Sequence, residues 1–272
     1  MIPAAVDYVR VDSVEAAIAA LAEVGDEAKL LAGGQSLVPF MRLRLATPSV
    51  LVDIGRLDDL TGISVDGDTV VIGALTTHSA LEHSADLVAA CPLLAHVAAQ
   101  VGDPAVRHRG TLGGSLAHAD PASDLPAAVL ALGGTLVVTG PGGTREVAAT
   151  DFFTGFLESA LAADEVLTEV RVPVSTAGWA YQKFNRRAQD WAIVGAVVAE
   201  GGAGVALVNM GSTPLRASAV EAAVASGASA AEAAAGAADG TDPPTDTQAD
   251  AAYREHLARV LTARALTEAG VV

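Results

Sequence analysis

The sequence predicts an α+β fold built from three consecutive parts. Strand-like and helical segments alternate over residues 1–56, which indicates a small βαβ unit. Over residues 57–176, runs of short strands with helices grouped between them indicate an antiparallel sheet with helices. Residues 177–272 begin with a predicted three-stranded meander and end in helices, as in a small α+β domain. A chain of 272 residues suits two or three such compact parts.

The first part shows the clearest helix signals. Ser13 stands at an N-cap position, apolar residues follow at helical spacing to Glu23, and Gly25 comes just past the end. Pro39 is compatible with the first turn of a later helix. The other elements expected here are a strand over 28–32, a helix over 38–45 and a strand over 50–54.

The second part opens with a hairpin over residues 62–73, in which Asp66-Gly67 forms the turn. We expect helices over 77–82, 93–101 and 125–132, and strands over 135–139, 144–147 and 165–173.

The third part contains three apolar strand candidates, at residues 180–184, 192–199 and 204–210. Helices are expected over 216–225 and 250–269. Residues 226–235 have helix propensity but almost no large apolar side chain, which predicts a short surface helix. Residues 236–246, with two adjacent prolines, are expected to form a polar loop.

Composition excludes several classes of protein. The formal charge of −16 argues against binding nucleic acid or anionic membranes, because both need a basic surface. Cys91 is the only cysteine, which excludes an internal disulfide and a cysteine-ligated iron–sulphur cluster within this chain. No secretory signal and no apolar run of membrane-spanning length is visible, so a cytoplasmic location is expected.

Two double-glycine motifs carry the strongest functional signal, at residues 31–37 (LAGGQSL) and 111–117 (TLGGSLA). A Gly-Gly pair can adopt positive φ and lets the main chain approach a ligand closely. Successive N–H groups can then form an anion-binding nest beside the following helix. Two such backbone cradles in an acidic chain suit a long, doubly charged ligand, and a dinucleotide pyrophosphate fits this description best.

With both motifs in place, the chain resembles the FAD-binding medium subunit of the molybdenum hydroxylases, the group that includes aerobic carbon monoxide dehydrogenase and the xanthine dehydrogenases. The likeness runs nearly end to end and includes residues 120–124 (DPASD) and 181–187 (YQKFNRR). It implies a two-part FAD-binding region, over 1–56 and 57–176, followed by a C-terminal α+β domain over 177–272.

The resemblance also implies a set of cofactor-binding residues. Residues 32–36 and 111–115 would wrap the FAD pyrophosphate, and Asp124 would bond polar parts of the cofactor. Lys183 would lie near the flavin end, where a cation can stabilise anionic reduced flavin, and Trp191 would stack on the isoalloxazine. The full implied set is Ala32, Gly33, Gly34, Gln35, Ser36, Leu37, Val101, Thr111, Gly113, Gly114, Ser115, Asp124, Val166, Lys183 and Trp191.

Two of these positions depart from the family pattern. Gln35 replaces a His found in some relatives; in other flavoproteins of similar fold a Gly-Gly-His histidine carries the flavin covalently, so non-covalent FAD is expected here. Trp191 stands where the family often has Tyr, which keeps the stacking but loses the phenolic hydroxyl. Structural alternatives remain: Asp124 could cap the helix over 125–132, Lys183 could be a solvated edge lysine, and Trp191 could simply pack in the core.

The residues indicate neither a metal site nor a catalytic side chain. His78 and His83 are not spaced at i,i+4, and the pair His118 and Asp120 lacks a third ligand at plausible spacing.

The resemblance also implies partner subunits. A large subunit would hold the molybdenum cofactor, and a small subunit would hold two [2Fe-2S] clusters, in a dimer of heterotrimers. Electrons would pass from the clusters through FAD to an external acceptor. The alternatives are a self-contained FAD-dependent oxidase and a non-catalytic FAD-binding module.

Overall fold

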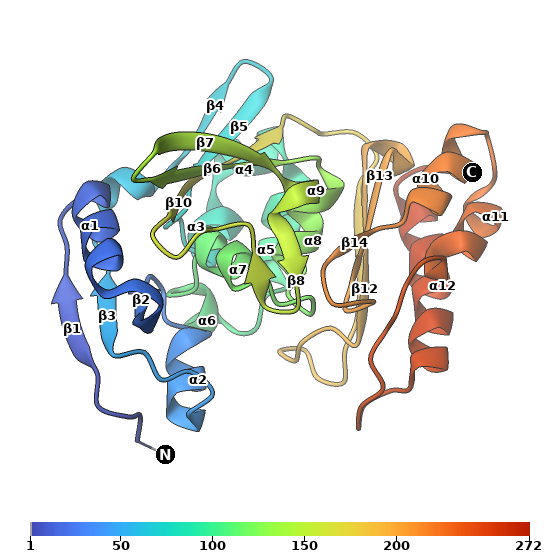
Figure 1. Cartoon of the computed structure of the whole chain (residues 1–272). Helices are drawn as coiled ribbons and strands as arrows, with labels where there is room; N and C mark the ends of the chain where they lie inside the picture. Colours follow the sequence, from blue (N-terminus) through green and yellow to red (C-terminus); the bar gives the residue numbers. More distant parts are fainter. Residues whose placement is uncertain (1) are drawn as a thin grey trace.

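The computed structural model describes residues 2–272, and its three larger sheets follow one another across the molecule (Figure 1). The N-terminal sheet lies at one end, the central sheet and its helices in the middle, and the C-terminal sheet lies next to the last helices (Figure 1). The α+β class predicted from the sequence is confirmed. No helix among residues 2–272 is long and apolar enough to cross a membrane.

The first sheet is parallel, in the order β1-β3-β2. Helix α1 (Val14–Val24) begins as predicted, with the Ser13 hydroxyl accepting the Ala16 N–H at 3.1 Å. Ala17 and Leu21, four residues apart, form its buried stripe. The remaining elements are β1 (Asp7–Arg10), β2 (Ala28–Leu31), α2 (Leu37–Leu43) and β3 (Val50–Asp53).

The central sheet is antiparallel, in the order β4-β5-β10-β6-β7, as the sequence predicted. Its middle strand, β10, carries the buried residues Val170 and Val172. Strands β8 and β9, which come between β7 and β10 in the sequence, form a separate two-stranded sheet. The bounds are β4 (Ile63–Asp66), β5 (Thr69–Gly73), β6 (Thr135–Gly140), β7 (Gly143–Ala148), β8 (Phe153–Gly155), β9 (Glu158–Ser159) and β10 (Val166–Pro173).

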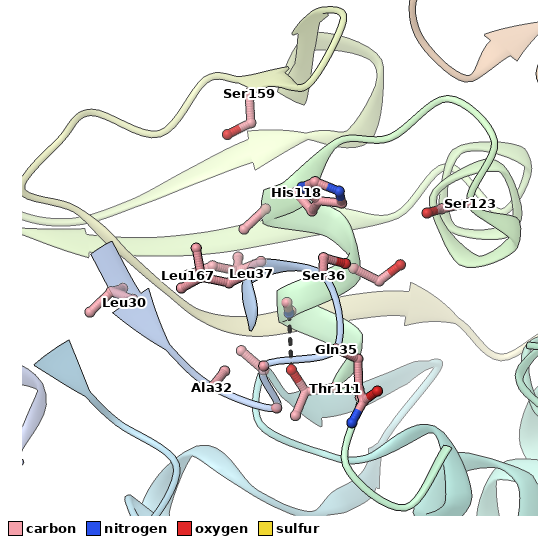
Figure 2. A pocket seen from close by; sticks show the side chains of 18 of the residues that line it. Leu30, Ala32, Gln35, Ser36, Leu37, Thr111, His118, Ser123, Ser159 and Leu167 are labelled. Carbon is pink, nitrogen blue, oxygen red and sulfur yellow. Dashed lines mark hydrogen bonds between the residues drawn. The ribbon is translucent and has the colours of Figure 1, made fainter. Parts of the chain in front are cut away.

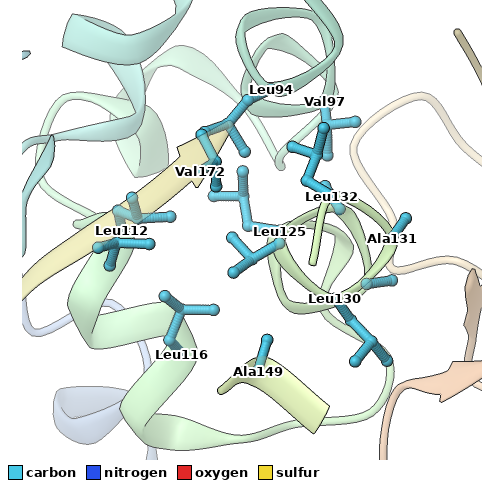
Figure 3. Close-up of a cluster of buried hydrophobic side chains, with 14 of the residues drawn as sticks. Leu94, Val97, Leu112, Leu116, Leu125, Leu130, Ala131, Leu132, Ala149 and Val172 are labelled. Atoms are coloured by element: carbon cyan, nitrogen blue, oxygen red, sulfur yellow. The ribbon is translucent and has the colours of Figure 1, made fainter. Parts of the chain in front are cut away.

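Seven helices accompany this sheet, and leucines and small aliphatic residues form the core between them (Figure 3). Leu112, Leu116 and Leu125 are fully buried, and each contributes about 2 kcal/mol by leaving water. The helices are α3 (His78–His83), α4 (Ala85–Ala90), α5 (Pro92–Ala99), α6 (Pro104–Arg107), α7 (Leu112–His118), α8 (Asp124–Ala131) and α9 (Ala149–Phe152).

The C-terminal sheet contains the three predicted strands and a fourth, β14, of only two residues. All six residues of β12 are buried, because α8 covers one face of the sheet and α12 (Ala251–Glu268) the other (Figure 1). This two-sided burial explains why the strand is apolar at every position. The bounds are β11 (Ala180–Phe184), β12 (Val194–Ala199), β13 (Gly204–Val208) and β14 (Leu215–Arg216).

The last helices correct two details of the prediction. The helix expected from residue 216 begins at 218, because Arg216 pairs with β13. The expected surface helix instead buries Ala230, Ala233 and Ala234 in the C-terminal core. Small side chains let this helix pack closely against the C-terminal core. The helix is therefore partly buried although it has no large apolar residues. The helices are α10 (Ser218–Ala225), α11 (Ala230–Ala234) and α12 (Ala251–Glu268).

Candidate functional site

One cavity of about 940 Å³ brings the predicted residues together. All fifteen predicted cofactor-binding residues line this cavity. They extend from the end of β2, in the first sheet, to β11 and the loop after it, in the C-terminal sheet. Figure 2 shows Gln35 and Ser36, on the loop that leads into α2 at Leu37, beside helix α7, with Ser123, Ser159 and Leu167 around the same space. This volume is in the upper range of ligand cavities, which suits a ligand larger than a mononucleotide.

The first glycine motif has the donor groups that an anion needs. The N–H groups of residues 33–37 donate no hydrogen bond within residues 2–272. Gly34 has φ +73°, as predicted for a turn of this kind. A Cβ built on Gly33 would lie 2.0 Å from the Arg109 carbonyl oxygen, so this loop packs directly against the chain entering the second motif. Consecutive unpaired N–H groups fit a pyrophosphate.

The second glycine motif differs from the prediction. Gly113 and Gly114 lie in the first turn of α7, and neither has positive φ. The N–H groups of residues 112–115 bond to the Thr76 and Ala74 carbonyls and to the Thr111 hydroxyl and carbonyl, at 2.8–3.1 Å; the Thr111 hydroxyl bond is the dashed line in Figure 2. The two motifs are therefore not equivalent nests.

Close approach explains the two glycines of the second motif. A Cβ on Gly113 would lie 2.6 Å from the Ala74 Cβ, and one on Gly114 would lie 2.7 Å from the Thr111 Oγ1. Glycine therefore lets α7 pack on the end of β5 and keeps the N-cap of α7 intact. The wall of the cavity here consists of the small, tightly packed start of a helix.

Asp124 and Lys183 form a buried ion pair in the cavity wall. The Lys183 ammonium donates to Asp124 Oδ2 at 2.7 Å, and the side chains are 7% and 6% exposed. The Tyr181 hydroxyl donates to Asp124 Oδ1 at 2.5 Å. Burial raises the pKa of the Asp124 carboxyl, against the opposing effect of the Lys183 ammonium and the Tyr181 hydroxyl. Two alternatives considered from the sequence are therefore wrong. Asp124 is not the N-cap of α8, because Ser123 takes that position, and Lys183 is buried and so is not a solvated edge lysine.

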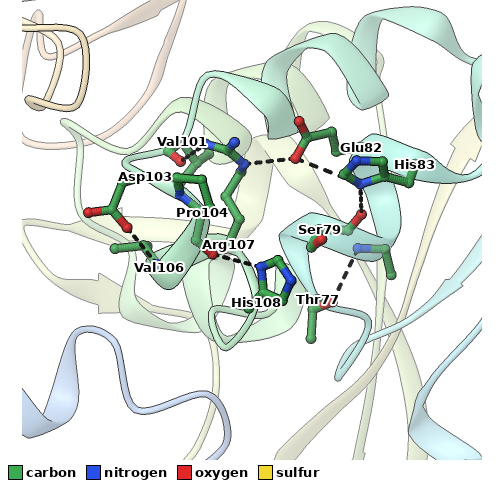
Figure 4. Close-up of polar contacts among 11 residues, drawn as sticks. Thr77, Ser79, Glu82, His83, Val101, Asp103, Pro104, Val106, Arg107 and His108 are labelled. Atoms are coloured by element: carbon green, nitrogen blue, oxygen red, sulfur yellow. Dashed lines mark hydrogen bonds and ion pairs between the residues drawn. The ribbon is translucent and has the colours of Figure 1, made fainter.

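Val101 and Val166 line the cavity from two rigid positions. The Val101 carbonyl accepts a 3.1 Å hydrogen bond from the Arg107 guanidinium, which also pairs with Glu82 at 2.8 Å (Figure 4). This contact ties the loop after α5 to α3 and α6. Val166 is fully buried at the start of β10.

Trp191 lies in the loop between β11 and β12 and is 55% exposed. Core packing, the alternative considered from the sequence, is therefore wrong. Gln189 and Asp190 line the cavity from the same loop. Large exposed aromatic surface beside a cavity is available to a planar ligand.

Sequence reasoning missed two histidines in the cavity wall. His118 packs edge-on against Phe40 with ring centroids 5.2 Å apart, and burial lowers the pKa of its imidazole. His78 is 4% exposed, its Nδ1 has no hydrogen-bond partner within residues 2–272, and burial lowers its pKa to about 4. From the sequence both were considered only as metal ligands, and only the three-dimensional contacts place them in the cavity wall.

Two known families match consecutive parts of the chain. Residues 4–175 match the family described as the FAD binding domain in molybdopterin dehydrogenase. Residues 179–269 match the CO dehydrogenase flavoprotein C-terminal domain. The chain thus contains the two domains of an FAD-binding subunit of an oxidoreductase.

Individual relatives agree with these matches along the whole chain. The carbon monoxide dehydrogenase medium chain of Hydrogenophaga pseudoflava is 41% identical, over 99% of this chain and 98% of the relative. A solved carbon monoxide dehydrogenase from that organism has a chain that superimposes with a TM-score of 0.93 at 42% identity, over 99% of this chain and 98% of that one. Quinoline 2-oxidoreductase from Pseudomonas putida 86 gives 0.91 at 33% identity, over 99% and 98%. The chain belongs to the family of FAD-binding medium subunits of molybdenum hydroxylases.

Proposed function

We propose that this chain carries electrons through FAD within a heteromeric molybdenum hydroxylase. FAD, when bound, would supply the redox chemistry between an iron–sulphur donor and an external acceptor. A large subunit would hold the molybdenum cofactor and a small subunit two [2Fe-2S] clusters, in a cytoplasmic dimer of heterotrimers. That two relatives are medium chains of carbon monoxide dehydrogenases supports a multisubunit enzyme.

The observation that carries the proposal is the row of N–H groups at residues 33–37 in the cavity, which have no acceptor among the described residues 2–272. These groups would bind the pyrophosphate of FAD, because five consecutive donors stabilise an anion without any cationic side chain. The backbone cradle lets a chain of charge −16 hold a doubly charged ligand. Gln35 offers no nucleophilic ring nitrogen, so the cofactor would be held without a covalent bond.

The other cavity residues would orient the flavin end. Lys183 would place its ammonium beside the flavin, where a cation favours the anionic reduced form, and Asp124 would keep that ammonium in place. Trp191 would cover one face of the isoalloxazine, and Val101 and Val166 would limit water from the apolar side. Thr111, Gly113, Gly114 and Ser115 would complete the wall along α7.

This chain would not determine the substrate of the holoenzyme. Relatives at similar identity carry different names: the 6-hydroxypseudooxynicotine dehydrogenase complex subunit alpha of Paenarthrobacter nicotinovorans is 38% identical over 99% of this chain and 96% of its own length. Because the medium subunit would handle only electrons, its cavity residues need not differ with the substrate.

Subunit reconstitution tests the proposal. The purified chain loaded with FAD should show no turnover with carbon monoxide or organic substrates, whereas a small chemical reductant should bleach its flavin absorption. Turnover should require both the iron–sulphur and the molybdenum subunits. Substrate-dependent turnover by the isolated chain would favour the self-contained oxidase. Failure of the reduced flavin to pass electrons to any diffusible acceptor would favour a non-catalytic module.

A further inference from the structure

Asn209 makes hydrogen bonds to two segments that are distant in sequence and border the cavity. It follows β13 with φ 61°, a conformation that asparagine tolerates better than most residues. Its side-chain amide donates to the Ala192 and Ile193 carbonyls at 2.9 and 3.2 Å. Its backbone N–H donates to the Pro121 carbonyl at 2.8 Å.

Arg254, on α12, donates to the same Ile193 carbonyl as Asn209. This side chain is 1% exposed on α12, and its guanidinium donates to the Ile193 carbonyl and pairs with Asp246 at 2.8 Å. The Ile193 N–H in turn donates to the Phe184 carbonyl at 2.8 Å. Ile193 is therefore fixed by three hydrogen bonds at the base of the loop that begins after Phe184.

The rest of this loop, residues 185–191, has few anchors of its own. The Asn185 side chain donates to two loop carbonyls, of Ala188 and Asp190, at 3.4 and 3.5 Å, which is long for a hydrogen bond. Trp191 is exposed, yet it directly precedes the fixed residues Ala192 and Ile193. The position of the indole is thus determined mainly from the base of the loop.

We infer that Asn209 is a positioning residue that fixes the base of the 185–193 loop and thereby sets where Trp191 stands over the cavity. Through Pro121, the same residue ties this loop to the 120–124 segment, which ends at Asp124. The hydrogen bonds of Asn209 thus connect the segment that carries Trp191 with the segment that carries Asp124, the partner of Lys183. The effect on flavin rests on the proposed function, whereas the effect on the loop does not.

Limited proteolysis of the full-length, FAD-free chain tests the loop directly. Arg186 and Arg187 are exposed trypsin sites within it. Asn209→Gly keeps the positive φ and the backbone N–H but removes both side-chain bonds, so tryptic cleavage after these arginines should accelerate about tenfold, as expected for two lost hydrogen bonds that hold a local structure. Mass spectrometry identifies the cut.

The matched control is Glu200→Gly, because Glu200 also has positive φ, lies in the same domain and is exposed. It should leave cleavage in the loop unchanged. Unchanged cleavage in Asn209→Gly would overturn the inference. If Asn209→Gly does not fold, Arg254→Met removes the other donor to Ile193 and should produce the same acceleration; unchanged cleavage there would equally overturn it.

A spectroscopic readout separates positioning from mere stability. Because the chain has two tryptophans, Trp191 is the only tryptophan in a Trp179→Phe background, so selective tryptophan excitation reports on it alone. FAD should quench this emission in the parent, and Asn209→Gly should weaken the quenching and shift the flavin absorption envelope. Faster cleavage with unaltered quenching and envelope would keep the loop clamp but refute the contact of Trp191 with flavin in the proposed function.

Discussion

The Lys183 ammonium and the Asp124 carboxylate meet at 2.7 Å although 59 residues separate them. Lys183 comes from the C-terminal sheet and Asp124 from the first turn of α8 in the central part. Lys183 also donates to the Gln100 carbonyl at 2.9 Å. The pair therefore joins two parts of the chain in the wall of the shared cavity and holds a cation where we propose the flavin end to lie.

Removing one member of this pair should cost much stability. Lys183→Met leaves Asp124 buried without its counter-charge, and such a change costs about 3–5 kcal/mol. Urea unfolding of the FAD-free chain measures the loss. The double variant Lys183→Met/Asp124→Asn should recover part of it, because no unpaired charge remains buried.

An exposed ion pair provides the control for this experiment. Arg171 pairs with both Glu146 and Glu169 on the central sheet, and the three side chains are 38%, 58% and 29% exposed. Arg171→Met should cost less than about 1 kcal/mol. Equal losses in Lys183→Met and Arg171→Met would show that burial of the Asp124–Lys183 pair has no energetic consequence.

Gly33 should not tolerate even one added methyl group. Its Cβ would lie 2.0 Å from the Arg109 carbonyl oxygen, a backbone atom that cannot move aside. Gly33→Ala should therefore destabilise the chain by about 2–3 kcal/mol and abolish FAD retention, since the shift displaces the free N–H groups. Gly142→Ala is the control, because nothing lies within 4 Å of that Cβ. Normal flavin content in Gly33→Ala would refute the cradle.

Local signals in the sequence predicted most elements. Ser13 caps the helix expected after it, and the apolar run of β12 predicted a strand. The missed elements lack such signals. All four residues of β1 are exposed, so no alternation marks it. Strand β14 is too short for any periodicity and forms only because β13 offers it an edge.

The fifteen predicted residues lie together around one cavity, but their geometry was not predictable from the sequence. Every residue inferred from the motifs lines one cavity, yet nothing in the sequence reveals that Tyr181 and Lys183 share one carboxylate. The two glycine motifs look alike, and only their packing makes one an open row of donors and the other a closed helix start. Contacts between distant segments decide these differences.

Trp191 should contribute directly to cofactor affinity. If its indole covers the flavin, Trp191→Ala should weaken FAD binding by about 1–3 kcal/mol, the scale of aromatic stacking plus lost burial. Trp191→Tyr should retain most of the affinity. Titration of the FAD-free chain, followed by flavin fluorescence, gives the dissociation constants. Trp179 packs against His96 and does not line the cavity, so Trp179→Phe should have no effect; affinity that is the same in Trp191→Ala would rule out the contact.

His78 should make the stability of the chain depend on pH. Burial, with the nearby charge of Arg107, lowers the pKa of His78 from 6.5 to about 4. The unfolded chain therefore takes up a proton on this residue as the pH falls below about 6.5, while the folded chain stays neutral until about pH 4. The unfolded state binds more protons in this window, so the free energy of unfolding falls with falling pH. The loss from this residue alone should reach about 3 kcal/mol.

Urea unfolding of the FAD-free chain at several pH values between 4 and 7.5 measures this dependence. His78→Gln cannot titrate, so its free energy of unfolding should fall less steeply than that of the parent between pH 6.5 and 4. His83→Gln alters an exposed histidine at the end of the same helix, with a side chain 71% exposed, and should keep the parental slope. If His78→Gln keeps the full slope as well, His78 must be charged in the folded chain, and its unpartnered Nδ1 must find a partner that stabilises the proton.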